Sequence, residues 1–114
     1  AAAAEAARQA SMPGTVYVRI GSINTYSGAL QNVSNAVYID GSCYGAGSAG
    51  GSTIQLNPGP HTVYGQLQEA GYIFTSPTQS FVLSGNGEAY VKIMIKNARA
   101  VIYLCSSRSE WLSN

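Results

Sequence analysis

The sequence predicts an all-β protein, a small antiparallel β-sandwich of about seven to eight strands with an Ala-rich N-terminal arm. Two observations carry this prediction. Apolar and polar residues alternate with a period of two along most of the chain, and turn residues recur about every eight to twelve positions. A chain of 114 residues makes one domain. We divide it into an arm over residues 1–14, a sandwich over residues 15–105 and a tail over residues 106–114.

The first twelve residues, AAAAEAARQASM, differ from the rest of the chain. Ala, Glu, Arg and Gln favour helix, but a helix of about twelve residues is marginal in isolation. No large apolar side chain precedes Met12, so we expect the arm to need a surface to lie on. Pro13-Gly14 ends any helix. The sequence leaves open whether the arm is helical or extended.

Each expected strand is an alternating segment between two turn signals. In the first, Val16, Val18 and Ile20 share one face, and Tyr17 and Arg19 share the other. The expected strands are, in order, residues 15–20, 36–40, 52–56, 61–68, 71–75, 80–83, 89–96 and 99–105. The turn signals are Asp40-Gly41, Pro58-Gly59, Ala70-Gly71, Ser76-Pro77 and Gly85-Asn86-Gly87. Such short, regularly punctuated strands are typical of antiparallel sandwiches and barrels.

The last expected strand, RAVIYLC at residues 99–105, differs from the others because it is apolar on both faces. Such a strand is expected to be buried on both sides. We therefore consider Val101 and Tyr103 candidate contact residues between chains.

The segment Gly45-Ala-Gly47-Ser-Ala-Gly50 matches the G-x-G-x-x-G pattern of dinucleotide-binding loops. That site needs a helix after the third glycine, because the helix N-terminus holds the pyrophosphate. Here β-forming residues and then a turn follow, and no Lys of a phosphate-binding loop is present. We interpret the segment as a long, flexible connection, and we predict no nucleotide and no other cofactor.

Charged residues make up only 10% of the chain, and the net charge is +1. This composition provides no electrostatic footprint for nucleic acid or an anionic membrane. No apolar run reaches the ~18 residues of a membrane span. A neutral, hydrogen-bonding surface suits an extracellular or cell-surface protein. The start in small Ala residues is compatible with cleavage by a signal peptidase.

Cys43 and Cys105 lack the spacing of a zinc site. In an exported protein they are expected to form a disulfide, within one chain or between chains. The alternative is two buried free thiols. Asn32-Val33-Ser34 is a glycosylation sequon that fits the same compartment, which makes Asn32 a candidate acceptor.

The sequence shows no catalytic constellation. His61 is the only histidine, and a histidine without partners makes no triad. The carboxylates after the arm are spread singly along the chain: Asp40, Glu69, Glu88 and Glu110. Glycosidases need two facing carboxylates and calcium needs clustered oxygens. We therefore expect no enzyme and no metal site.

Four motifs follow one another in a recognisable order. VYIDG (37–41), LNPGPHTV (56–63), AGY (70–72) and SFVLSGNGEAYVKIMI (80–95) resemble the PEGA domain and its carboxypeptidase-regulatory-like relatives. The resemblance covers roughly residues 36–95 and implies a small prealbumin-like sandwich. It also implies a surface or envelope module that binds, spaces or assembles, and it brings no catalytic residues.

Five tyrosines alternate with aliphatic residues along the expected strands: Tyr17, Tyr38, Tyr64, Tyr90 and Tyr103. We expect them to cover one sheet face, where they would offer a flat platform to a sugar or another protein. The alternative is a half-buried second face of the sandwich.

The leading hypothesis is a non-enzymatic extracellular structural subunit that self-assembles into a surface filament or layer. The strand AVIYLC would fill a groove in a neighbour by strand addition. The alternative is a carbohydrate- or protein-binding accessory module of a larger secreted or cell-surface protein. In that case the tail is a linker, and Trp111 is an exposed anchor.

Overall fold

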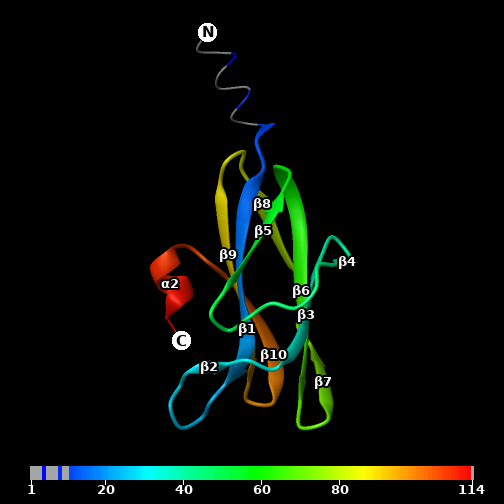
Figure 1. Ribbon diagram of the computed structural model, residues 1–114, viewed down its shortest axis with the longest axis vertical. Helices are drawn as coiled ribbons and strands as arrows, with labels where there is room; N and C mark the ends of the chain where they lie inside the picture. Colours follow the sequence, from blue (N-terminus) through cyan, green and yellow to red (C-terminus); the bar gives the residue numbers. More distant parts are fainter. Residues whose placement is uncertain (1–3, 5–7, 9–10, 114) are drawn as a thin grey trace.

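The computed structural model, which describes residues 4, 8 and 11–113, packs two β-sheets into a sandwich with the short helix α2 against one outer face (Figure 1). The predicted all-β, mostly antiparallel sandwich is confirmed. Most of the predicted N-terminal arm lies outside the described residues.

Sheet A is built around β1 (Gly14–Ile23), which has neighbours on both edges. Its strand order is β10-β9-β1-β2. Strand β5 pairs with the first half of β1, on the same edge on which β2 pairs with its end. The other bounds are β2 (Leu30–Gln31), β5 (Ser52–Leu56), β9 (Glu88–Lys96) and β10 (Arg99–Cys105). The pair β1–β9 is parallel, and the other pairs are antiparallel.

Sheet B is built around β6 (Gly59–Glu69) and is antiparallel throughout. Its order is β4-β3-β6-β7, and β8 pairs with the first half of β6. The other bounds are β3 (Ser34–Ile39), β4 (Ser42–Cys43), β7 (Tyr72–Thr75) and β8 (Gln79–Leu83).

All eight expected strands are present, and the bounds of β5 and β10 match the prediction. The described residues form ten strands, and the two that the sequence did not predict are β2 and β4. Each of these two strands is two residues long, too short to show a period. Helix α2 (Arg108–Leu112) was also missed, although Ser107 and Glu110 have the spacing of a capping box.

The core lies between the two sheets and is made by the alternating aliphatic residues. Its fully buried side chains are Val16, Val18, Ile20, Val37, Ile39, Val63, Leu67, Leu83, Val91 and Ile93. Gly65 marks a close approach of the sheets, since a Cβ there would lie 2.9 Å from both Ile20 and Ile93. This position therefore requires glycine for packing rather than for a turn.

Three hairpins turn through two residues that both have positive φ, as in type I′ turns. These are Asp40-Gly41, Ala70-Gly71 and Asn97-Ala98, with φ between 52° and 81°. Ala98, at φ 59°, is a poor residue for the left-handed region, which costs about 1 kcal/mol when a Cβ is present.

We expect Ala98→Gly to raise the free energy of unfolding by about 1 kcal/mol, because Asn-Gly suits this turn and removes the Cβ strain. Urea denaturation measures the change. The control is Ala100→Gly in β10, an ordinary strand position where the same substitution should lower stability. A loss of stability in A98G would contradict the strain argument.

Candidate functional site on the outer face of sheet A

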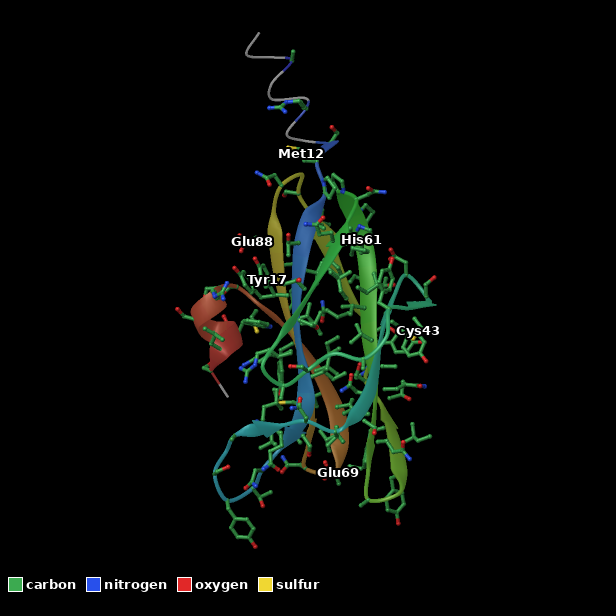
Figure 2. The ribbon with its side chains drawn as sticks, in the orientation of Figure 1. Met12, Tyr17, Cys43, His61, Glu69 and Glu88 are labelled. Atoms are coloured by element: carbon green, nitrogen blue, oxygen red, sulfur yellow. The ribbon has the colours of Figure 1, made fainter. Side chains whose placement is uncertain are left out.

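Helix α2 folds back on the outer face of sheet A, against β9 and β10 (Figures 1 and 2). Trp111 fixes it there: only 3% of this residue is exposed, and its indole Nε1 donates to the Val91 carbonyl at 2.9 Å. The ring contacts Tyr17 and Tyr90, each with its centroid at 5.8 Å. The prediction that Trp111 is an exposed anchor in a linker is therefore wrong.

Two buried cations hold the end of α2. Arg19 Nη1 donates to the Trp111 carbonyl at 2.7 Å. Lys92 Nζ donates to the carbonyls of Glu110 and Ser113 at 3.1 and 2.6 Å. These carbonyls lie at the C-terminal end of α2, where the negative end of the helix dipole favours cations, and that of Glu110 also accepts from the Ser113 amide at 3.3 Å. Each charge is therefore solvated by backbone oxygen. The alternation placed Arg19 and Lys92 outside the core, but it gave no signal that the tail covers them.

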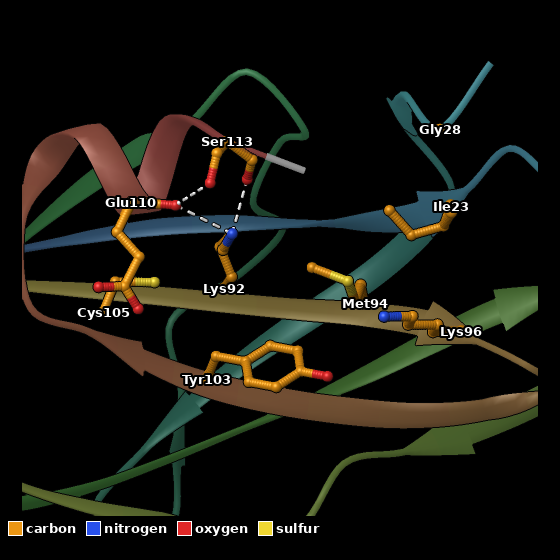
Figure 3. Close-up of a pocket in the computed structure, with 9 residues that line it drawn as sticks. All are labelled: Ile23, Gly28, Lys92, Met94, Lys96, Tyr103, Cys105, Glu110 and Ser113. Carbon is orange, nitrogen blue, oxygen red and sulfur yellow. Dashed lines mark hydrogen bonds between the residues drawn. The ribbon is translucent and has the colours of Figure 1, made fainter.

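A pocket of about 420 Å³ lies beside α2, and we call it the sheet A pocket (Figure 3). Its lining residues are Ile23, Gly28, Lys92, Met94, Lys96, Tyr103, Cys105, Glu110 and Ser113. A second hollow of about 270 Å³ shares Lys96 and Tyr103 with it and continues to Arg99 and Val101. Strands β9 and β10 thus provide a floor of mixed character, with Lys96 and Arg99 at one end and Lys92 beside Glu110 at the other (Figure 3).

The tyrosines lie on two faces, so the prediction that they share one face is wrong. Tyr17 stacks on Tyr90 outside sheet A at 5.0 Å, and Tyr38 stacks on Tyr64 outside sheet B at 4.7 Å. Tyr103 lines the sheet A pocket. Alternation shows which residues share one side of a strand, but not to which sheet the strand belongs.

Strand β10 pairs with β9 of its own sheet and occupies the edge of that sheet. Its predicted burial on both faces is wrong, since Tyr103 and Leu104 are 44% and 43% exposed. Val101 and Ile102 are half-buried. The strand is thus part of the chain's own sheet, and its second edge is open.

Cys43 and Cys105 are free thiols, so the predicted disulfide within the chain is wrong. Cys43 is exposed on β4 of sheet B, whereas Cys105 is buried on β10 of sheet A. Burial raises the pKa of the Cys105 thiol. Asn32 is exposed, and its Oδ1 accepts from the Ala49 amide at 2.7 Å. Its glycosylation stays a prediction.

The glycine-rich loop is tied down by side chains on both sheets. Asn35 accepts from the Gly47 amide at 2.8 Å, and Arg19 Nε donates to the Ala49 carbonyl at 2.8 Å. Strand β5 follows the loop, as predicted. Gly51, at φ 112°, lies against Trp111, and a Cβ there would be 2.6 Å from the indole. The loop thus forms part of the support for α2.

His61 is fixed at the edge of the core by both ring nitrogens. Nδ1 lies 2.6 Å from Asp40 Oδ2, and Nε2 lies 2.7 Å from the Asn57 carbonyl. Hydrogen bonds to Asp40 and Asn57 raise the pKa of His61, and the bonds from His61 and the Thr62 amide lower the pKa of Asp40. The sequence missed this pair because 21 positions separate its members.

Over the described residues, no group of three or more His, Cys, Asp or Glu side chains is placed to hold a metal ion. In the same part of the chain, no helix has the length and apolar character needed to cross a membrane.

We expect the stability lost in Asp40→Asn to depend on pH. Protonated His61 stabilises the fold below its ordinary pKa of 6.5, and this contribution is lost as the pH rises through the raised pKa. The carboxylate contributes above its ordinary pKa of 3.8, and this is lost as the pH falls through the lowered pKa.

The difference in unfolding free energy between the wild type and D40N should therefore be largest between about pH 4 and 6.5. It should not exceed about 1 kcal/mol, because the Asp40 side chain is 48% exposed. Urea denaturation from acid to alkaline pH measures it. A difference that does not change with pH would count against the pair.

Gly51→Ala should lower the free energy of unfolding by about 2 kcal/mol, because the new Cβ meets Trp111 and φ is unfavourable. It should also shift the fluorescence of the only Trp toward the red as α2 loosens. Gly50→Ala is the matched control: its nearest atom would be at 3.5 Å, an ordinary contact. Equal effects of both substitutions would refute the Trp111 contact.

Comparison of the chain with family models, curated proteins and solved structures gives no match. The resemblance to the PEGA domain rests on the motifs quoted above and stays a prediction.

Proposed function

We propose that this chain is a non-enzymatic, extracellular structural subunit that assembles with copies of itself into a surface filament or layer. One contact is the open edge of β10, which we call the β10 edge: the backbone groups of Ala100, Ile102 and Leu104. The observation that carries the proposal is that β10 is a regular edge strand with no strand beside it in the described sheet.

The hairpin register shows which backbone groups point outward. Lys96 and Arg99 flank the two-residue turn, so they exchange both of their backbone hydrogen bonds. From this pair onward, hydrogen-bonded and non-hydrogen-bonded pairs alternate along the two strands. Residues 101, 103 and 105 therefore bond to β9. Ala100, Ile102 and Leu104 direct their N–H and C=O groups away from it, toward a further strand.

This edge lacks the usual protection against pairing. Proteins usually prevent an edge strand from pairing with another chain by placing proline, a bulge or charged side chains in it. Strand β10 contains no proline, its register with β9 is unbroken over seven residues, and its one charge is Arg99 at the first position. Exposed Tyr103 and Leu104 add apolar surface at the other end. The edge therefore favours β-augmentation by another chain.

An extended assembly needs a second contact, since a two-fold pair through β10 closes on itself. The outer face of sheet B supports one. The strands of sheet B contain no Lys, Arg or Asp, and their one Glu, Glu69, ends β6. Val82 and Ile73 are 76% and 70% exposed in this sheet. A flat, uncharged face that no helix covers suits stacking between subunits.

The same face favours the second candidate function, a carbohydrate- or protein-binding accessory module. Tyr38 and Tyr64 project from it, and glutamine and threonine surround them. The two rings stack on each other with an interplanar angle of 4°. One face of each ring is therefore covered by the other ring and is not available to a sugar. For this reason the geometry supports stacking on a sugar less than contact with another subunit. Binding to a glycan array by monomers, lost in Tyr64→Ala, would favour the module.

Leu104→Lys tests the proposal. We expect the wild type to self-associate and the variant to associate at least about tenfold more weakly, because a lysine on the edge repels the next strand. Sedimentation velocity over a range of concentrations measures the constant, and negative-stain microscopy shows the assemblies. Tyr26→Lys, which places a lysine on the exposed loop between β1 and β2 and outside both proposed contacts, is the control and should leave association unchanged. Wild-type monomers at millimolar concentration would overturn the proposal.

A further inference from the structure

We infer that the occupant of the β10 edge is a second copy of this chain, paired antiparallel about Ile102, so that Arg99 of each copy binds Glu110 of the other. The inference rests on the proposed function and specifies its register and symmetry. Charge complementarity between the two ends of β10 carries it.

The first end carries two uncompensated cations. Lys96 and Arg99 are directly opposite each other in the β9–β10 ladder and share its outer face. Like charges in such a pair destabilise a sheet. Within the described part of the chain neither makes an ion pair, and together they line one hollow. In a protein with only 10% charged residues, this end of β10 lacks its counter-charge.

The other end carries a fixed carboxylate. Glu110 accepts hydrogen bonds from the Ser106 hydroxyl and amide at 2.6 and 3.2 Å. Ser106 directly follows Cys105, the last residue of β10, so these bonds hold the carboxylate beside the strand end. They also lower the pKa of Glu110, so the group is anionic at neutral pH. It is exposed, and in the described residues it has no salt-bridge partner.

Antiparallel pairing about Ile102 brings these two ends together. The outward backbone groups of Ile102 bond to those of Ile102 in the second copy, and the groups of Ala100 bond to those of Leu104 in the second copy. Arg99 then lies opposite Cys105 of the second copy, in a pair without mutual hydrogen bonds, where side chains approach most closely. In that copy Glu110 is hydrogen-bonded to Ser106, the residue after Cys105, so its carboxylate is within reach of the Arg99 guanidinium. The two-fold axis repeats the contact.

The same register pairs Val101 with Tyr103 of the second copy, a β-branched and aromatic combination that stabilises sheets. Parallel in-register pairing would instead place Arg99 beside Arg99 and Glu110 beside Glu110. Charge repulsion therefore selects the antiparallel arrangement.

Charge reversal in trans tests this register. Arg99→Glu gives a copy with two acids at the contact, and Glu110→Arg gives a copy with two bases. Each variant alone should self-associate about tenfold more weakly than the wild type, because both contacts become repulsive. An equimolar mixture should regain association, because the heterodimer has an opposite-charge pair at both contacts. This gain should shrink at high salt.

Sedimentation equilibrium of the two variants, singly and mixed, measures the constants. Recovery in the mixture is a gain that local damage to either variant does not produce. The control is Arg108→Glu, which reverses the charge of a residue on α2 that lies over the Tyr17 ring, outside the proposed contact. Its association constant should stay within about twofold of the wild-type value.

A mixture no stronger than the single variants would overturn the register. If Leu104→Lys still dissociated the wild-type assembly in that case, the β10 contact of the proposed function would stand. A monomeric wild type would overturn both.

Discussion

Strand β1 is the element on which the rest of sheet A depends, because it has partners along both of its edges. One edge bonds in parallel to β9, and the other bonds in turn to β5, to Ser48 of the glycine-rich loop and to β2. Its inner face supplies fully buried side chains to the core, and its outer face supplies Tyr17 and Arg19 to the support of α2. With β1 in the centre and β9 beside it, β10 becomes the edge strand.

The distribution of charge follows from the way that α2 is held. Arg19 and Lys92 lie beneath the helix and are satisfied by its terminal carbonyls, so they are not available to other chains. The cations at the β9–β10 turn and the carboxylate of Glu110 are left exposed at opposite ends of one open strand. In the proposed pairing of two copies, this separation of opposite charges along the edge sets the direction in which the second strand binds.

Strand patterns were predictable because they are local. The alternation of aliphatic and polar residues identified all eight longer strands, and the turn residues identified most of their ends. The β-forming residues after Gly50 also predicted that a strand follows the glycine-rich loop, and β5 confirms it. The two-residue strands and the five-residue α2 are too short for a period to show, and only the capping spacing of Ser107 and Glu110 hinted at the helix.

The sequence by itself determined which residues face inward on most of the longer strands, where the hairpins turn and how little charge the chain carries. Only the tertiary structure decided which strands share a sheet, and hence that Tyr17 and Tyr38 lie on opposite faces and that Cys43 and Cys105 stay apart. It alone decided that Trp111 is buried. The physical reason is that periodicity reports one strand at a time, whereas sheet order and helix docking depend on contacts between segments far apart in the chain.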